Sequence, residues 1–140
     1  MSEELAMYEP ANAGNSYNYI CTIDTASEDG QISVYNALSN ARALSEYMDT
    51  PIDIVDVLQE PGIRRSRQVG VPDSPCVNTY LVAADGTAYF TQSDGVARCV
   101  ARLLTIFKGG FRSTSKGCVR AKCVSETLRN GNTIKSLVLC

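Results

Sequence analysis

Hydrophobic and polar residues alternate over residues 77–91, on both sides of an Asp85-Gly86 pair. Asp-Gly between two β-prone runs predicts a hairpin, and a two-residue turn pairs Val82 with Tyr89 across the strands. Because successive side chains of a strand point to opposite faces, one face becomes the core face. That face holds Leu81, Ala83, Ala88 and Phe90. The other face holds two tyrosines on neighbouring strands, Tyr80 and Tyr89, and is a candidate binding face.

Apolar residues at helical spacing predict two helices. The first covers residues 31–48, and Asp49-Thr50-Pro51 ends it because the residue before a proline avoids the helical region. The second covers residues 94–107, with Ser93 as its N-cap and the glycines of residues 108–110 as its stop.

Alternating and β-branched segments outside the hairpin predict four more strands. They are Tyr17–Ile23, Ile52–Leu58, Cys118–Leu128 and Thr133–Leu139. A loop punctuated by proline and glycine, residues 60–75, leads from the second of these into the hairpin.

From residue 52 onward the predicted order is strand, loop, hairpin, helix, hairpin. This is the order of a five-stranded OB-fold barrel with a helix between strands 3 and 4. We therefore expect a mainly β protein with α elements, whose N-terminal strand and helix extend the barrel. Residues 17–140 are predicted to form one domain. Residues 1–16, acidic and rich in Asn and Gly, are predicted to be a flexible N-terminal arm.

Composition excludes several classes of chemistry. The chain has no histidine, which removes Ser-His and Cys-His catalytic pairs, and its six cysteines include no C-x-x-C zinc pattern. No glycine-rich phosphate-binding loop is present. No apolar run is long enough for a membrane span, and the acidic N-terminus is unlike a signal peptide. We expect a cytoplasmic protein that is not an enzyme and holds no metal or cofactor.

Charge is divided sharply along the chain. Residues 1–60 contain eleven acids and one base, a net charge of −10, whereas residues 61–140 contain four acids and twelve bases, a net charge of +8. Such asymmetry favours nucleic-acid contact on the basic side. The alternative is that the two halves neutralise each other within one fold.

OB-folds bind oligonucleotides across strands 2 and 3 and through the loop between strands 1 and 2. In this chain those elements offer the rings of Tyr80 and Tyr89 for base stacking, unless the N-terminal helix covers them. The loop offers Arg64, Arg65 and Arg67 for phosphates, unless it is only a solvated loop. Further cations extend a basic track over the fourth strand and the loop before it: Arg120, Lys122, Lys108, Arg112 and Lys116. Arg129 and Lys135 could lengthen this track.

Two segments resemble a known family. Residues 78–82 and 85–97 look like the central hairpin and helix start of single-stranded DNA-binding proteins from bacteriophages and related mobile elements, and the turn at residues 130–135 is similar in style. The resemblance implies an OB-fold protein that coats exposed single strands with little sequence preference during phage DNA replication or recombination. It also implies a homo-oligomer that acts with replication or recombination proteins. The chain departs from the bacterial pattern in having no tryptophan and no acidic C-terminal tail.

Two other hypotheses use the same residues. The first is a protein–protein interaction module, such as a phage inhibitor or assembly factor, on the same face. The second is a metal-dependent nuclease built from Asp53 and Asp56, with Asp85 and Asp94. It is disfavoured because residues three apart on a strand are expected to point to opposite faces.

Overall fold

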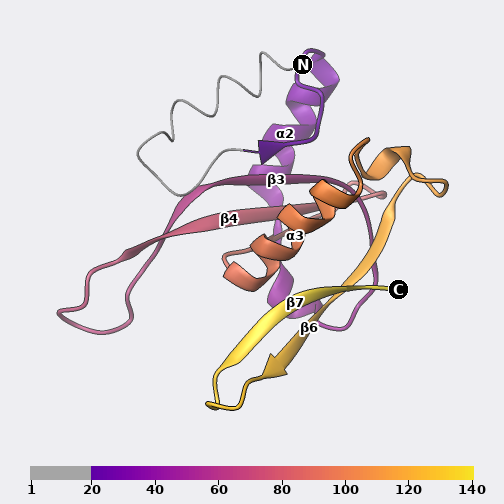
Figure 1. Ribbon diagram of the computed structural model, residues 1–140. Coiled ribbons are helices and arrows are strands. Elements are labelled where there is room, and N and C mark those ends of the chain that lie inside the picture. Colours follow the sequence, from indigo (N-terminus) through magenta and orange to yellow (C-terminus); the bar gives the residue numbers. More distant parts are fainter. Residues whose placement is uncertain (1–19) are drawn as a thin grey trace.

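The computed structural model describes residues 20–140 (Figure 1). The arm predicted at residues 1–16 lies outside the described residues, as do the first three residues of the predicted strand at 17–23. The elements are β1 (Ile20–Cys21), α2 (Glu28–Asn40), β2 (Arg42–Ala43), η1 (Leu44–Tyr47), β3 (Ile52–Arg64), β4 (Ser74–Ala83), β5 (Ala88–Thr91), α3 (Asp94–Ile106), η2 (Phe111–Ser113), β6 (Val119–Thr127) and β7 (Thr133–Leu139).

The strands form one curled sheet that closes about half of a barrel. Their order is β2-β5-β4-β3-β6-β7, and β1 pairs with β3 outside this path. All pairs are antiparallel except that of β2 with β5. β3 is the central strand: residues 52–54 pair with β6, and residues 54–64 pair with β4. Its register with β4 shifts between Ile54 and Asp56, as at a β-bulge. The protein is therefore mainly β, as the sequence predicted.

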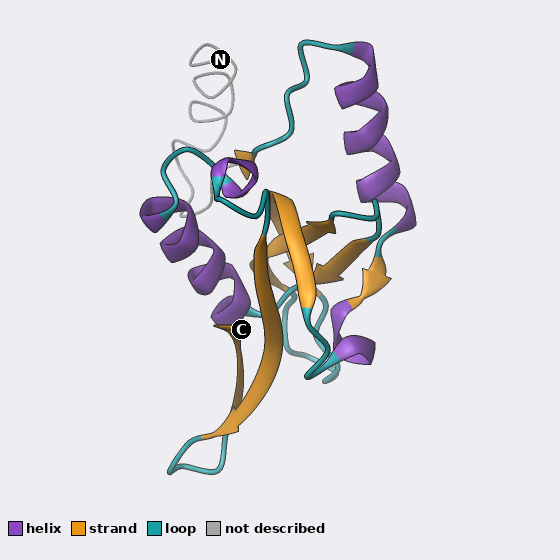
Figure 2. Ribbon diagram, turned by 90° about the vertical axis from the view of Figure 1, so that its right-hand side faces the viewer, coloured by secondary structure: helices purple, strands orange, loops and turns teal. Residues whose placement is uncertain are grey.

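The two helices cover opposite faces of the sheet (Figure 2). On one face, α3 contributes Val96, Val100 and Leu103 to a core that we refer to as the α3-side core. On the other face, Ala37 of α2 packs with Leu58 of β3 in a second core, the α2-side core. Burial on both faces explains the continuous buried run of β3 from residue 54 to residue 59.

The first helix is shorter than predicted. The sequence predicts one helix over residues 31–48, but α2 ends at Asn40 and is followed by β2 and η1. The reason is topological, because Ala37 belongs to the α2-side core whereas Leu44 belongs to the α3-side core. The chain passes around the edge of the sheet between them, where β2 pairs with β5. One straight helix cannot pack on both faces of a sheet.

The paired part of β3 and β4 is longer than predicted and extends beyond the body of the protein as an arm (Figure 1). β3 and β4 stay paired as far as Arg64 and Ser74, so the predicted loop of residues 60–75 shrinks to residues 65–73. Gly62 permits this close pairing, since a Cβ there would overlap the side chain of Asn78. The second helix and the last strand agree closely with prediction, and the Ser93 hydroxyl accepts a hydrogen bond from the Val96 amide at 3.2 Å.

Candidate nucleic-acid interface

The predicted pairing of the β4–β5 hairpin is wrong by one residue. Leu81, not Val82, lies opposite Tyr89, and Tyr80 lies opposite Phe90. The turn has three residues, because Gly86 takes a positive φ of 91° and its amide donates to the Ala83 carbonyl at 2.9 Å. A slip of one residue moves every side chain of one strand to the other face. Tyr80 and Tyr89 therefore lie on opposite faces of the sheet.

Neither tyrosine offers the predicted stacking platform. Tyr80 is 7% exposed in the α2-side core, with its ring 5.2 Å from that of Phe90, and its hydroxyl donates to a Glu60 carboxylate oxygen at 3.3 Å. Tyr89 packs against the α3-side core, edge-on to Tyr47 at 5.0 Å. The alternative reading is correct for Tyr80, since α2 covers its face.

Burial of Tyr80 has a consequence at alkaline pH. Desolvation, and then the charge and hydrogen bond of Glu60, raise the pKa of Tyr80 to about 12 from the ordinary value of 10.0. Between these values the unfolded chain has lost a proton that the folded protein keeps, so stability falls as pH rises from about 10 to about 12. We expect Tyr80→Phe to flatten this part of the pH dependence of urea unfolding. Equal slopes for the variant and the wild type would contradict the assignment.

A basic groove lies between the β3–β4 arm, the start of α3 and β7. Its volume is about 1090 Å³. Five cations line it: Arg64, Arg65, Arg67, Arg98 and Lys135. Asp94 is the one carboxylate among the described lining residues, so the groove is strongly positive. The groove also receives the N-terminal end of α3, whose dipole favours anions.

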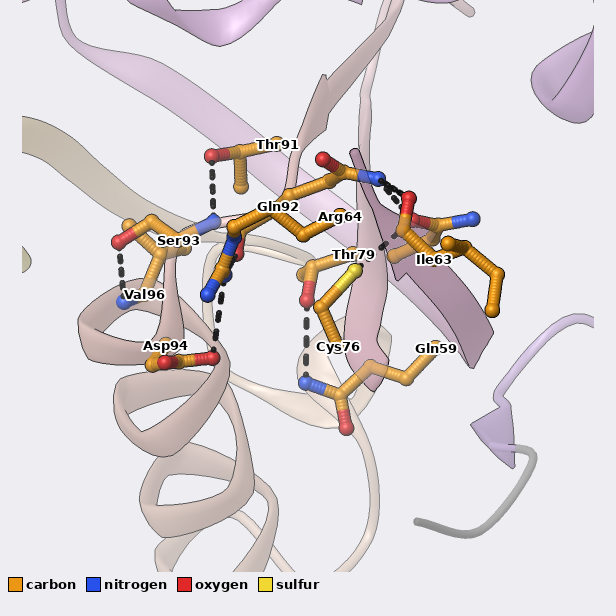
Figure 3. Close-up of polar contacts among 11 residues, drawn as sticks. Gln59, Ile63, Arg64, Cys76, Thr79, Thr91, Gln92, Ser93, Asp94 and Val96 are labelled. Carbon is orange, nitrogen blue, oxygen red and sulfur yellow. Dashed lines mark hydrogen bonds and ion pairs between the residues drawn. The ribbon is translucent and has the colours of Figure 1, made fainter. Parts of the chain in front are cut away.

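A network of polar contacts holds the arm against α3 (Figure 3). The guanidinium of Arg64 donates to the main-chain oxygen of Gln92 and lies 3.4 Å from a carboxylate oxygen of Asp94. The Gln92 amide donates in turn to the Ile63 carbonyl at 3.2 Å and to the Asn78 side chain at 3.0 Å. These contacts fix one wall of the groove before any ligand binds, which lowers the entropic cost of binding.

A buried glutamine joins α3 to the β3–β4 arm. Gln59 is 5% exposed, and its amide donates to the Thr79 hydroxyl at 3.4 Å and to the Ala97 carbonyl at 3.2 Å. The first turn of α3 is thus joined to both strands of the arm. On the other side Gly95 meets β7 so closely that a Cβ would overlap the Lys135 carbonyl oxygen. The groove therefore has walls of fixed spacing.

The structure brings some of the predicted contact residues together and separates others. Arg64, Arg65 and Arg67 line the groove, as expected from one loop. Arg112 instead forms a two-pronged pair with the buried carboxylate of Asp56, at 2.7 and 3.0 Å. Arg120 pairs with Asp53 at 2.7 Å, and this hydrogen bond lowers the pKa of the Asp53 carboxyl. Both arginines are thus partnered within the protein.

The three lysines predicted on the fourth strand and in the loop before it also lie outside the groove. Lys108 follows α3 and is exposed, Lys122 lies on β6 opposite Val138, and Lys116 lines a smaller pocket beside Asp53 and Arg120. Their contact with DNA stays a prediction. The continuous basic track predicted from the sequence is therefore split into separate patches.

One groove cation, Arg98, was not among the residues that the sequence analysis selected, and Lys135 was selected only as an extension of the basic track. Arg98 is exposed on α3 one turn after Asp94, and Lys135 is half-buried on β7. They meet the arginines of the arm only because α3 and β7 lie side by side. The sole hint in the sequence is that Arg98 follows the predicted helix start by one turn, on the same face as Asp94.

The two charged halves of the chain neutralise each other in part. Asp53 and Asp56, from the acidic half, hold Arg120 and Arg112 from the basic half. Asp53 lies opposite Arg120 of β6, and Asp56, after the register shift of β3, lies opposite Val82 of β4. Within residues 20–140, no group of three or more His, Cys, Asp or Glu side chains could hold a metal ion. In the same range, no helix is long and apolar enough to cross a membrane.

Comparison with known proteins identifies a family. A family model of the Phi29 phage type, described as "Phage Single-stranded DNA-binding protein", matches residues 13–139. No curated protein and no solved structure matches the chain. The matched range includes every helix and strand described above and all walls of the basic groove.

Proposed function

The chain belongs to the phage single-stranded DNA-binding protein family and binds single-stranded DNA, and we propose that the strand lies in the basic groove between the β3–β4 arm and β7. We propose further that the protein coats exposed strands with little sequence preference during phage DNA replication or recombination, in the cytoplasm of the host bacterium. Coating requires no bond to be broken, so we propose a non-enzymatic protein that acts as a homo-oligomer alongside replication or recombination proteins.

The observation that carries this proposal is the charge of the groove. Five cations against one carboxylate give a surface suited to a phosphate backbone. Three of the cations are arginines on one hairpin arm, and guanidinium groups bind phosphates in a two-pronged manner. Contacts of this kind position a strand without reading its bases, which supports binding with little sequence preference.

The strand order supports an OB-like barrel around this groove. Strands β3 to β7 take the order β5-β4-β3-β6-β7, with α3 after the third of them. An OB-fold binds through its strand 2–3 face and the loops after strands 1 and 4. In this chain the first of those loops is residues 65–73 at the end of the β3–β4 arm, of which residues 65–67 line the groove, and the second is residues 128–132 at the end of the β6–β7 hairpin. The basic groove lies between the β3–β4 arm and the β6–β7 hairpin, where an OB-fold would hold its ligand.

Two arginines on one helix provide the test. Arg98 lines the groove, whereas Arg102, one turn further along α3, is exposed outside it. We expect Arg98→Gln to weaken binding to a thymidine oligomer roughly threefold to tenfold at low salt. It should also lower the slope of log affinity against log salt by about 0.7, the value for one phosphate contact on a single strand.

Fluorescence anisotropy of a labelled oligomer, titrated at several salt concentrations, measures both quantities. Arg102→Gln is the matched control and is expected to bind as the wild type does. Equal losses for the two variants would show that net charge, not the groove, governs binding. If both variants bind the oligomer as tightly as the wild type does, the proposed path of the strand is contradicted.

A further inference from the structure

We propose that the tip of the β3–β4 arm of one copy docks on the outer face of α2 of the next copy, so that copies join head to tail along a bound strand. The arm tip is defined as residues 69–71. The outer face of α2 is defined as the stripe of Glu28, Ile32, Tyr35 and Ser39. This inference rests on the proposed function, since the bound strand brings the copies together.

The arm tip is apolar where a solvated loop would be polar. Val69 is fully exposed, at 106%, and Val71 is 49% exposed, while Ile63 on the same arm is 60% exposed. Gly70, with φ of 84°, turns the chain between the two valines. The arm extends beyond the body (Figure 1). Exposed apolar side chains that gather at one projecting point indicate a contact surface.

The outer face of α2 is apolar in a similar way. Ile32 is 50% exposed and Tyr35 is 71% exposed. With Glu28 and Ser39 they follow a spacing of four, three and four residues, which keeps them on one side of a helix. The core-facing residues of α2, which include Ala37, lie on the opposite side. Arm and α2 together hold five of the nine large hydrophobic side chains that are exposed in the described residues.

Charge makes these two surfaces complementary. The helix α2 begins with Glu28 and Asp29 and contains no basic residue. Residues 64–73 of the arm contain three arginines and one aspartate. Opposite charges around an apolar contact favour the joining of unlike surfaces over that of like surfaces. The arm of one copy is therefore suited to α2 of another copy, and not to a second arm.

The positions of the surfaces determine the kind of assembly. The basic groove lies between the arm and the start of α3, whereas α2 covers the opposite face of the sheet (Figure 2). A contact between two different surfaces of identical chains joins them head to tail, and it gives an open series of copies when the rotation between neighbours does not close a ring. An extended strand that passes from one copy to the next favours the open series. Each contact is small, so a strand that holds two copies close together supplies the concentration that the contact needs.

The test compares oligonucleotides that hold one copy and two copies. We expect wild-type protein to bind the two-site thymidine oligomer at least about tenfold more tightly per site than the one-site oligomer. The double variants Val69→Ser/Val71→Ser and Ile32→Ser/Tyr35→Ser should each lose this gain and bind the one-site oligomer as the wild type does. Ile106→Ser, which removes a side chain 62% exposed on α3, is the control and should retain the gain.

A mixture of the two double variants tests the head-to-tail geometry. The intact arm of one variant can dock on the intact α2 of the other in one of the four possible arrangements on two sites. An equimolar mixture should therefore recover part of the gain on the two-site oligomer but little of it on longer strands. Wild-type protein without any gain on two sites would overturn the inference while leaving single-strand binding intact. Weaker one-site binding by the arm-tip variant would also overturn it, because the tip would then contact DNA. Failure of the wild type to bind the one-site oligomer would instead contradict the proposed function.

Discussion

Replacing Gly95 by alanine is expected to lower the melting temperature by roughly 5–10 °C, from a loss of about 2–3 kcal/mol in the free energy of unfolding. In an ordinary helix this substitution stabilises by about 0.5–1 kcal/mol, so the sign is inverted. The reason is the close approach of α3 to β7, since a Cβ at Gly95 would overlap the Lys135 carbonyl oxygen. That oxygen is part of the backbone and can move only with the strand.

Thermal unfolding followed by circular dichroism measures the loss, and hydrogen exchange shows where it arises. Protection should fall in β7 and in the first turn of α3, while the β3–β4 pair stays protected. Ala101→Gly, at an exposed position of the same helix, is the control for helix propensity. A stabilised Gly95→Ala protein would mean that α3 and β7 separate without cost.

Replacing Asp56 by alanine is expected to cost about 3 kcal/mol, or a fall of roughly 10 °C in melting temperature. The Asp56 side chain is 5% exposed and accepts two hydrogen bonds from Arg112. It also accepts one from the Thr22 hydroxyl at 2.8 Å. The carboxylate thus joins the segment before α2, the central strand and η2, and its loss removes the three hydrogen bonds that tie these elements together.

A matched aspartate lies three residues earlier on the same strand. Asp53 also holds an arginine with two hydrogen bonds, but both partners are substantially exposed. Exposed ion pairs contribute little to stability, so Asp53→Ala is expected to leave the melting temperature nearly unchanged. Comparable losses for the two variants, measured by urea unfolding at neutral pH, would show that burial of Asp56 does not determine its contribution.

The sequence predicts the local elements of this fold better than their partners. The strong signals were the Ser93 cap, the spacing of apolar residues in α3 and the Asp85-Gly86 turn. Each of them depends on neighbouring residues, which is why the bounds of α3 agree with prediction. The alternation along the last strand is local in the same sense. The turn signal, however, does not fix whether Ala84 belongs to the strand or to the loop. That single residue decides whether Tyr80 and Tyr89 share a face.

The candidate site shows the same limit. Arg64, Arg65 and Arg67 are close in the chain, and their shared position in the groove could be predicted. Arg98 and Lys135 come from other elements and join them only through tertiary packing. Arg112 and Arg120 had the right charge for DNA contact, but their partners Asp56 and Asp53 lie more than fifty residues away in the chain. A pattern along the sequence does not reveal which cations are neutralised in the fold.

The passage of the chain from α2 around the sheet edge to η1 bears on modularity. The segment before β3 is not an appendage, because Ala37 closes one core and Leu44 fills the other. The five strands β3 to β7 and α3 alone would leave Tyr80 and Leu58 without the cover of α2, so we expect them not to fold on their own. Transplanting the basic groove into another protein would therefore require the N-terminal segment as well, or a new helix that covers the same face of the sheet as α2.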